Sequence, residues 1–333
     1  MIRRRTLATA PLLGLAALRP DRAAAQQQTQ AGGAWPNRPL RMIIPWPPGQ
    51  QTDVAARLIA QLLTERLGQP VVPDNRPGAG GQIGTNAVAK GTPDGYTLLA
   101  ASIGPITFGP LVTRTPYDVE KELAPVASLG AAPFIVLVKP DFPARDLRAF
   151  IDLLKANPGK YTHNSSGVGG AQHLVTALFL AKAGLDALHV PFQGSGPALA
   201  ALLGGQVDFG FDTPAAAGRL VSSGQLRALA VTSAQPSPLV PGVPPIAAAG
   251  GPADYDVTSW FGVMVPTGTP RPVIDRMAEE IRQGAAGQEL RERFAGIGMS
   301  VDGALGPEQF MASLRSAWAT FDPVIRQLGI RAE

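Results

Sequence analysis

The feature that most constrains the fold is a regular alternation of short apolar runs with amphipathic segments, joined by junctions rich in glycine. Apolar runs at 40–44, 70–72 and 96–100 predict three strands. Residues 52–67 repeat apolar side chains at helical spacing, and 83–90 predict a second, shorter helix. The order strand, helix, strand, helix, strand predicts a parallel sheet covered by helices on both faces.

A second series of the same kind follows in the sequence. It comprises predicted strands at 134–138, 161–164, 189–191, 207–211 and 226–231, and predicted helices at 147–156, 172–183 and 198–203. A further buried strand is predicted at 260–265, and residues 271–330 are predicted to be mostly helical. We therefore predict an α/β protein of two lobes, each a sheet flanked by helices, with a cleft between the lobes.

The N-terminal segment has the three parts of a signal peptide. Three arginines lie within residues 1–5, an apolar stretch covers 7–18, and 23–25 is an Ala-x-Ala cleavage signal. Twelve apolar residues are too few to cross a bilayer. We predict that residues 1–25 are a signal peptide cleaved near Ala25, that 26–34 are a flexible lead-in, and that the mature protein is periplasmic. The pair Arg4-Arg5 leaves Sec and twin-arginine export as alternatives.

Charge and composition exclude several classes of protein. The chain carries a formal charge of +4, but removing residues 1–25 leaves 24 basic and 24 acidic side chains, with no basic run to hold nucleic acid. No later stretch approaches 18 apolar residues, so the mature protein is not expected to be embedded in a membrane. There is no cysteine, which excludes disulfides, thiol nucleophiles and cysteine metal ligands.

Candidate binding residues lie where predicted strands run into helices. Ligands of open α/β sheets bind at the carboxyl ends of strands, where helix N-termini offer free N–H groups to anions. Three junctions combine glycine with small polar side chains. The candidates at these junctions are Pro48, Gly49, Gln50, Gln51, Thr52, Asp53, Ser165, Ser166, Gly167, Gly169, Gly170, Gln172, His173, Gln193, Gly194 and Ser195.

The same residues allow other interpretations. Ser195 could serve a hydrolase triad, although Gly194-Ser195-Gly196 is not a nucleophile-elbow motif. Glycines between 78 and 84 form neither a phosphate-binding nor a dinucleotide-binding motif. The three histidines lack metal-motif spacing, so neither a metal nor a cofactor is expected.

Two further questions stay open at the level of sequence. Asp212 is a candidate for binding an amine or hydroxyl group of a ligand, and equally for capping the helix that follows it. Trp46 and Trp260 could form cleft walls or belong to the core.

Several motifs resemble one family. They are PLRMIIPWPPG at 39–49 followed by Thr52-Asp53, DNRPGAGG at 74–81, TPDGYTL at 92–98, QHL at 172–174, HVPF at 189–192, LGGQVD at 203–208, LRALAVT at 226–232 and SWFG at 259–262. This set is similar to that of the tripartite tricarboxylate transporter substrate-binding proteins, also called the Bug family, from about residue 35 to the C-terminus.

The resemblance implies a type II-like periplasmic binding protein with residues 35–138 and 257–333 in lobe 1 and 139–256 in lobe 2. It implies a small carboxylate held by backbone amides and water from loops 48–53 and 165–173. Ser102, with Ile103 and Gly104, would add neighbouring walls, as would 193–195 and Asp212-Thr213.

The implied function is capture of a small organic carboxylate (a di- or tricarboxylate, an amino acid or an aromatic acid) for a membrane permease. We expect the binding protein to be a monomer. A periplasmic sensor for a signalling partner and a secreted α/β hydrolase using Ser195 are the alternatives. One departure stands out, because Gln50 and Gln51 occupy positions where the family usually has two glycines.

Overall fold

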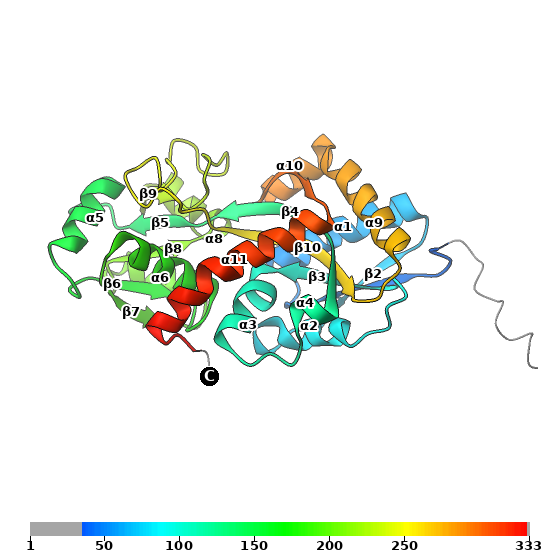
Figure 1. Ribbon diagram of the computed structural model, residues 1–333. Helices are drawn as coiled ribbons and strands as arrows, with labels where there is room; N and C mark the ends of the chain where they lie inside the picture. The colour runs from blue at the N-terminus through cyan, green and yellow to red at the C-terminus, as the bar shows by residue number, and fades with distance from the viewer. Residues whose placement is uncertain (1–34, 332–333) are drawn as a thin grey trace, which may run out of the picture. The chain divides into compact units, whose positions relative to one another are not determined.

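The computed structural model describes residues 35–331, so the predicted signal peptide and the whole of the predicted lead-in lie outside the described residues. From Pro36 onward the chain builds two β-sheets with helices on their faces (Figure 1). This is the predicted two-lobed α/β fold.

The first sheet has six strands in the order β11-β4-β10-β3-β1-β2. Their bounds are β1 Leu40–Ile44, β2 Val71–Asn75, β3 Thr97–Ser102, β4 Leu123–Pro133, β10 Thr258–Pro266 and β11 Ser300–Leu305. Strands β1, β2 and β3 are parallel, as predicted, and β10 runs antiparallel between β3 and β4. The helices of this lobe are α1 Gln51–Leu67, α2 Gln82–Ala89, α3 Gly109–Val112, α4 Val119–Glu122, α9 Arg271–Ala285 and α10 Gln288–Gly296, with short helical turns at Ala79–Gly81 and Gly104–Phe108.

The second sheet has five strands in the order β7-β6-β8-β5-β9. Their bounds are β5 Ile135–Val138, β6 Thr162–Ser165, β7 Leu188–Pro191, β8 Phe209–Asp212 and β9 Arg227–Val231. Strand β6 pairs in parallel with β7 and β8, and β5 runs antiparallel to β8 and β9. Its helices are α5 Leu147–Lys155, α6 Ala171–Ala183, α7 Ser195–Leu203 and α8 Pro214–Ser222.

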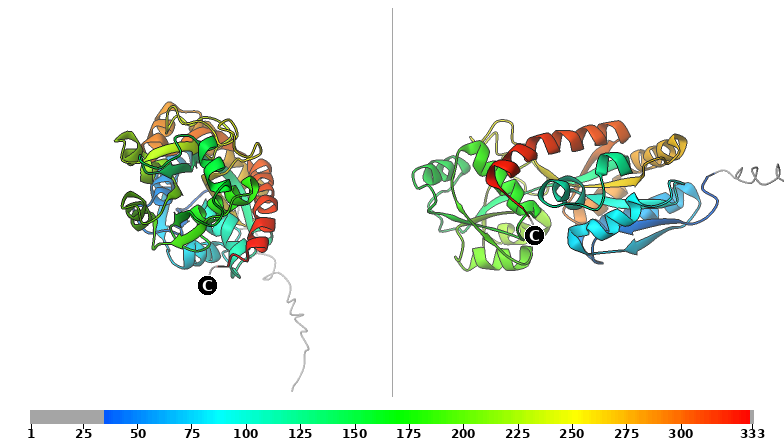
Figure 2. Two further views of the ribbon diagram at one scale, coloured as in Figure 1. Left: turned by 90° about the vertical axis from the view of Figure 1, so that its left-hand side faces the viewer. Right: turned by 60° about the horizontal axis from the view of Figure 1, so that its bottom comes forward.

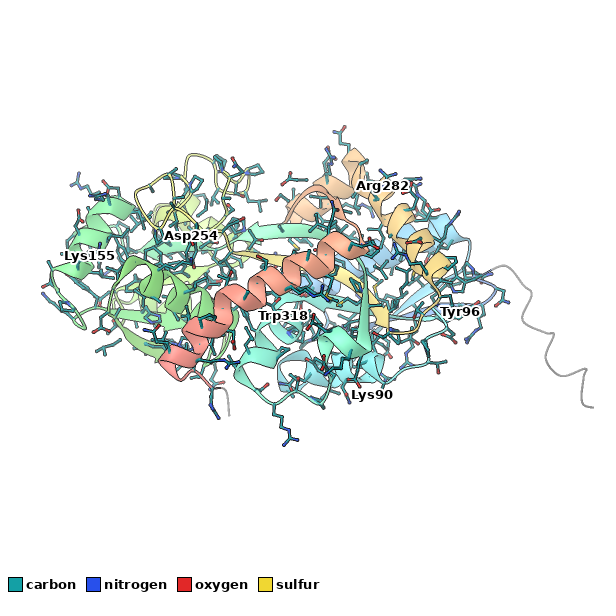
Figure 3. All side chains as sticks on the ribbon, in the orientation of Figure 1. Lys90, Tyr96, Lys155, Asp254, Arg282 and Trp318 are labelled. Atoms are coloured by element: carbon teal, nitrogen blue, oxygen red, sulfur yellow. The ribbon has the colours of Figure 1, made fainter. Side chains whose placement is uncertain are left out.

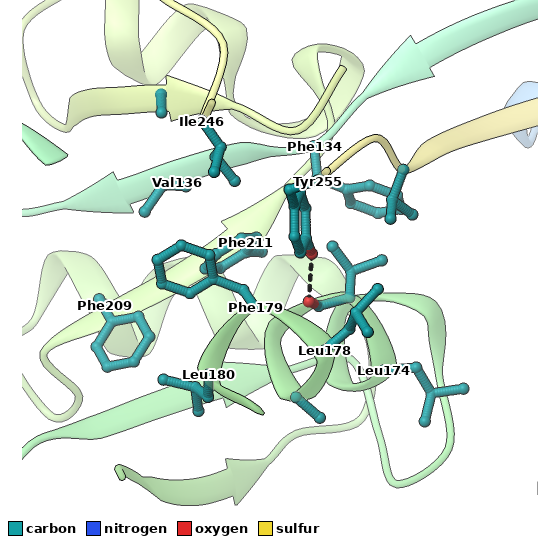
Figure 4. Close-up of a cluster of buried hydrophobic side chains, with 14 of the residues drawn as sticks. Phe134, Val136, Leu174, Leu178, Phe179, Leu180, Phe209, Phe211, Ile246 and Tyr255 are labelled. Carbon is teal, nitrogen blue, oxygen red and sulfur yellow. Dashed lines mark hydrogen bonds between the residues drawn. The ribbon is translucent and has the colours of Figure 1, made fainter. Parts of the chain in front are cut away.

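An aromatic core lies between the second sheet and helices α5 and α6. The Phe150 ring meets Phe209 edge-on at 5.0 Å between centroids, and Phe179 packs on Phe211 at 5.5 Å. Tyr255 is also buried here and donates its hydroxyl to the Val175 carbonyl over 2.6 Å (Figure 4). Buried apolar area of this kind is the main force that holds a lobe together.

The chain connects the two sheets at three places. Strand β4 leads through Phe134 into β5, and Val257 leads into β10. The third connection is the last helix, α11 Pro307–Leu328, drawn in red in Figures 1 and 2, which packs on β4 and reaches α6. Near its middle, Trp318 (labelled in Figure 3) donates its indole N–H to the Ile106 carbonyl over 3.3 Å.

Two strands were missed by the sequence analysis. Strand β4 reads LAPVASLGAAP, whose alanines, prolines and glycine disfavour a strand assignment. Strand β11 lies in the stretch predicted to be mostly helical, which was wrong for residues 300–305. By its pairing, β5 belongs to the second sheet, whereas the predicted lobe boundary placed residues up to 138 in lobe 1. The lobe boundaries themselves stay predictions.

Candidate ligand-binding site

The predicted binding loops lie at two sheet edges that share the connections between the lobes. Ser102, the last residue of β3, pairs with Phe261 of β10. Thr258, the first residue of β10, pairs with Pro133, the last residue of β4. On the other sheet, Asp212 ends β8 and pairs with Ile135, the first residue of β5. Because only Phe134 separates β4 from β5, the carboxyl ends of β3 and β8 lie beside the same crossing between the sheets.

In the first lobe, Asp53 organises the junction between β1 and α1. Its buried carboxylate accepts hydrogen bonds from the Gly49 N–H at 2.8 Å and from the Asn75 amide at 2.8 Å, and it pairs with Arg57 at 3.0 Å. Burial opposes ionisation of Asp53, but hydrogen bonds from Arg57, Asn75 and Gly49 hold its pKa below the usual range. Asp53 therefore shapes the loop, and its oxygens are already engaged within the protein.

Replacing Asp53 by asparagine is expected to lower the free energy of unfolding by about 1–3 kcal/mol, because an amide cannot accept all these bonds. The stabilisation from Asp53 is present above its ordinary pKa of 3.8 and is lost as the pH falls below it. Urea unfolding of the variant at pH 7 measures the effect, and Asp141→Asn, at an exposed carboxylate, is the control. Equal midpoints for the two variants would contradict this role.

The two glutamines that depart from the family pattern have different environments. Gln50 is exposed, whereas the Gln51 side chain donates to the carbonyls of Ile297 at 2.8 Å and Gly298 at 3.4 Å. Gly298 is packed so closely on Ala215 of α8 that a Cβ at 298 would lie 2.9 Å from the Ala215 Cβ. Gln51 thus ties the start of α1 to a turn that touches the second lobe, and a direct role toward ligand stays a prediction.

Tryptophan 46 lies at the same edge and is partly buried. Its indole N–H donates to the Ser102 hydroxyl over 2.9 Å, and its carbonyl accepts from Asn75 at 2.9 Å. A Cβ on Gly104 would come within 3.3 Å of the Trp46 ring, so glycine lets the ring approach this turn closely. Trp260 packs edge-on against Phe310 at 5.1 Å and joins the core of the first lobe.

In the second lobe, four polar side chains form one network. Gln172 donates to the Ser195 hydroxyl at 3.1 Å and to the Asp212 carboxylate at 3.4 Å, while accepting from Ser166. Ser195 donates to the other oxygen of Asp212. Burial raises the pKa of the Asp212 carboxyl, against the hydrogen bonds from Ser195, the Thr213 N–H and Gln172. The bond from the Thr213 N–H, at 2.8 Å, is also the helix-start contact that the sequence left open.

This network bears on the hydrolase alternative. Among the described residues, the hydrogen-bond partners of the Ser195 side chain are Gln172 and Asp212, and neither is a general base of the histidine type. The chain's three histidines lie together elsewhere.

The rings of His163, His173 and His189 form a stack that is hydrogen-bonded to the loop at 165–173. The rings of His173 and His189 are 3.8 Å apart at 9°, and those of His163 and His189 are 4.9 Å apart at 21°. His189 Nε2 lies 2.7 Å from the Ser165 hydroxyl, and His173 Nδ1 accepts from the Gly169 N–H at 3.1 Å. Of the predicted ligand residues, His173 therefore belongs to the stack and Ser165 is bonded to it.

Burial and neighbouring imidazoles keep the stack uncharged. Burial first, and then the charge of His189, lower the pKa of His163 to about 3 and that of His173 to about 4. Burial also lowers the pKa of His189. Over residues 35–331 no group of histidine and carboxylate side chains has the arrangement of a metal site, and near-parallel rings cannot aim their nitrogens at one ion.

The stack was missed in the sequence because it depends on sheet register. His163 pairs directly with His189 on the adjacent strand β7, and His173 comes from helix α6. Strand order and register cannot be read from the spacing of three single residues.

In the part of the chain that the structure describes, no helix has the length and apolarity needed to span a bilayer.

Comparison with known proteins gives a consistent result. Residues 55–330 match the profile described as "Tripartite tricarboxylate transporter family receptor". Protein BugT of Bordetella pertussis is 39% identical over 302 residues, covering 89% of this chain and 91% of BugT.

Three solved structures are similar along nearly their whole length. R. palustris Rpa4515 with adipate has 32% identity and a TM-score of 0.75, covering 89% of this chain and 99% of its own. The periplasmic binding protein BugD has 30% identity and a TM-score of 0.71, covering 90% and 100%. MatC (Rpa3494) from Rhodopseudomonas palustris with bound malate has 29% identity and a TM-score of 0.71, covering 87% and 100%.

Proposed function

Because this chain belongs to the tripartite tricarboxylate transporter receptor family of periplasmic solute-binding proteins, we propose that it captures a small organic carboxylate between its two lobes and delivers it to a membrane permease. Membership of the family implies export. The proposal includes cleavage near Ala25, a monomeric binding protein and no catalytic activity.

The observation that carries the proposal is that the N-termini of four helices lie near one another. Gln172 at the start of α6 bonds Ser195 at the start of α7 and Asp212 before α8. Gln51 at the start of α1 bonds Gly298, which lies against Ala215 at the start of α8.

The N-cap residues of α1, α6, α7 and α8 are Gln50, Gly170, Gly194 and Thr213, and none of them caps its helix with a side chain. Helices α9 and α10 also lack side-chain caps, so an uncapped start is not distinctive by itself. What sets α1, α6, α7 and α8 apart is that their N-termini lie near one another. By contrast α5, which starts at the far edge of its sheet, is capped by Asp146. Uncapped N–H groups and the helix dipoles favour a bound anion.

The buried network of the second lobe supports a preference within the carboxylates. A ligand carboxylate would take N–H donors of the helix starts, while Asp212 and the Ser195 hydroxyl could accept from a donor on the ligand. We therefore favour a ligand that carries a hydroxyl, ammonium or protonated carboxyl group besides its carboxylate. The solved relatives with adipate and malate carry carboxylic acids, which agrees with the carboxylate class.

Lobe closure is the proposed means of capture. A ligand held by both lobes binds the closed form better than the open form and shifts the population toward it. A signalling partner in place of a permease would use the same change, so the sensor alternative predicts the same ligand binding.

Thermal unfolding of the chain from Gln26 against mono-, di- and tricarboxylates, amino acids and aromatic acids tests the proposal. At 100 times its dissociation constant, a ligand adds about 2.7 kcal/mol of stability. For a chain of this size that raises the melting temperature by roughly 5 °C. A shift confined to one class of carboxylate is the expected result, and no shift across the panel would contradict the carboxylate proposal.

A variant pair locates the site. Gln172→Ala is expected to weaken the binding of the identified carboxylate about tenfold, because it breaks the network that positions Ser195 and Asp212. Gln235→Ala, at an exposed loop position, is the matched control and should bind normally. Ester turnover that disappears in Ser195→Ala would instead support the hydrolase alternative.

A further inference from the structure

The histidine stack and the predicted ligand loop meet in the first turn of helix α6. His173 is the third residue of α6, and its side chain reaches back to the Gly169 N–H, which donates to Nδ1 over 3.1 Å. The residue before it, Gln172, belongs to the network with Ser195 and Asp212. One turn of helix therefore carries both a side chain of the proposed carboxylate site and a side chain of the stack.

The loop before α6 contains two glycines in backbone conformations that other residues rarely adopt. Gly167 has a φ of 138° and Gly169 a φ of 73°. Glycine loses more conformational freedom on ordering than any other residue, so a loop of this kind binds a ligand weakly unless other contacts order it beforehand. The bond from Gly169 to His173 is one such contact, and the 2.7 Å contact between His189 Nε2 and the Ser165 hydroxyl is another.

The bond to Gly169 requires an uncharged ring at His173. A neutral imidazole accepts at one nitrogen, whereas a protonated imidazole has a donor at both and would turn a second donor toward the Gly169 N–H. His163 and His173 are 2% and 8% exposed, and burial lowers the pKa of both. The stacked ring of His189, 3.8 Å away, also restricts rotation of the His173 ring.

The surroundings of the stack supply no partner that would favour a charged ring. The three histidines line a cavity of about 390 Å³, in which Asp186 is the carboxylate and the end of α11 adds no charged side chain. Among the described residues, no hydrogen bond or ion pair joins Asp186 to the rings. The stack is thus built to present a neutral acceptor to the loop.

We infer that His173 is a positioning residue of the carboxylate site, whose neutral ring fixes Gly169 and with it the first turn of α6. The N–H groups of Gly167, Gly169 and Gly170 are all engaged within the protein. The N–H groups of a first helical turn have no partner inside an α-helix, so the start of α6 is where this loop offers donors to a carboxylate. The inference rests on the proposed function, and it gives His173 an indirect role in place of the direct ligand contact predicted from sequence.

Two NMR measurements on the ligand-free wild-type protein test the geometry. At pH 7, ¹⁵N spectra of the three imidazoles should show His173 as the tautomer with a proton on Nε2 and none on Nδ1. After correction for local sequence, the Gly169 amide should exchange with solvent about tenfold more slowly than that of Val168, which is 48% exposed. A proton on Nδ1 of His173, or equal exchange of the two amides, would overturn the inference.

A pair of variants separates the acceptor from the rest of the ring. His173→Asn and His173→Leu both remove the imidazole from the stack, but the side-chain oxygen of asparagine can accept from Gly169 in place of Nδ1. We expect His173→Asn to bind the identified carboxylate within about threefold of wild type, and His173→Leu to bind it about tenfold more weakly than His173→Asn. Leu328→Ala, at the exposed end of α11 that lines the same cavity, is the control and should bind normally.

The outcomes distinguish this inference from the carboxylate proposal. Equal affinities of His173→Asn and His173→Leu would overturn the inference alone, because wild-type binding is measured in the same experiment. Failure of the wild-type protein to bind any carboxylate of the panel would overturn both. If His173→Leu is poorly folded, His173→Gln takes its place, since its amide lies one carbon further from the backbone and is out of register with the Gly169 N–H.

Discussion

Lowering the pH from 7 to 5 is expected to reduce the free energy of unfolding by about 2–4 kcal/mol through the histidine stack. His163 and His173 have a pKa of about 3 and about 4 in the folded chain, against an ordinary value of 6.5. As the pH falls toward 5, these two histidines therefore bind protons in the unfolded chain but stay neutral in the folded chain. Stability from the stack is complete above pH 6.5 and is lost as the pH falls toward the folded values. At pH 5 each such group contributes a loss of about 2 kcal/mol, and coupling between the rings makes the sum smaller than the parts suggest.

The loss of stability at low pH can be assigned to the stack by experiment, because the sequence contains no other histidines. Most carboxyl groups titrate below pH 5 and so contribute little between pH 7 and pH 5. The three histidines line one cavity, and Asp186 is the carboxylate that lines it with them. Urea unfolding of His163→Phe at pH 7 and pH 5 should show roughly half the wild-type difference, since a ring of similar size remains beside Phe209. His189→Gln is the second variant, chosen at a less buried position. An unchanged difference in both variants would refute the role of the stack.

Truncating Phe321 to alanine should destabilise the chain by about 3–5 kcal/mol. The ring is 3% exposed and meets Phe108 edge-on at 4.8 Å, within a core that also contains Ile325 of α11 and Phe179 of the second lobe. The substitution leaves a cavity where α11 passes from one lobe to the other. Its effect should therefore exceed that of an ordinary surface change by several fold.

Leu328→Ala provides the matched control for this prediction. Leu328 lies in the last turn of the same helix but is 51% exposed, so its truncation should change stability by less than about 0.5 kcal/mol. Comparing the urea midpoints and slopes of Phe321→Ala and Leu328→Ala tests this prediction. If Phe321→Ala behaves like Leu328→Ala, the packing of α11 does not stabilise the lobes as described.

Much of the fold could be predicted because its strands are short apolar runs. The predicted strand at 40–44 has the bounds of β1, and the predicted helix at 52–67 begins one residue late. These elements carry their own signals, namely β-branched or apolar runs and an apolar helix face. Strands β4 and β11 carry no such signal, because pairing with neighbours, rather than local preference, makes them strands.

The candidate site was predictable only in part, for the same physical reason. The junctions that contain Gly170 and Gly194 could be found from local sequence, although the helix predicted at 198–203 begins three residues after the observed start of α7 at Ser195. The rule for open α/β sheets brings such junctions together. The partners of Gln51 are more than 240 residues away in the sequence, and the two groups to which Gln172 donates lie on two other junctions. Contacts of that kind depend on tertiary packing, which no local pattern encodes.

The position of β10 in the first sheet has a consequence for the order in which the chain can fold. This strand lies between β3 and β4, yet it is synthesised after every strand of the second sheet. Until it arrives, β3 and β4 have no partner on their facing edges, and the first lobe cannot close its core. The second sheet, by contrast, comes from the continuous segment 135–231, and its strands are complete earlier. The lobe whose strands begin first is thus the last to be finished, and its long-range pairing is expected to limit the rate of folding.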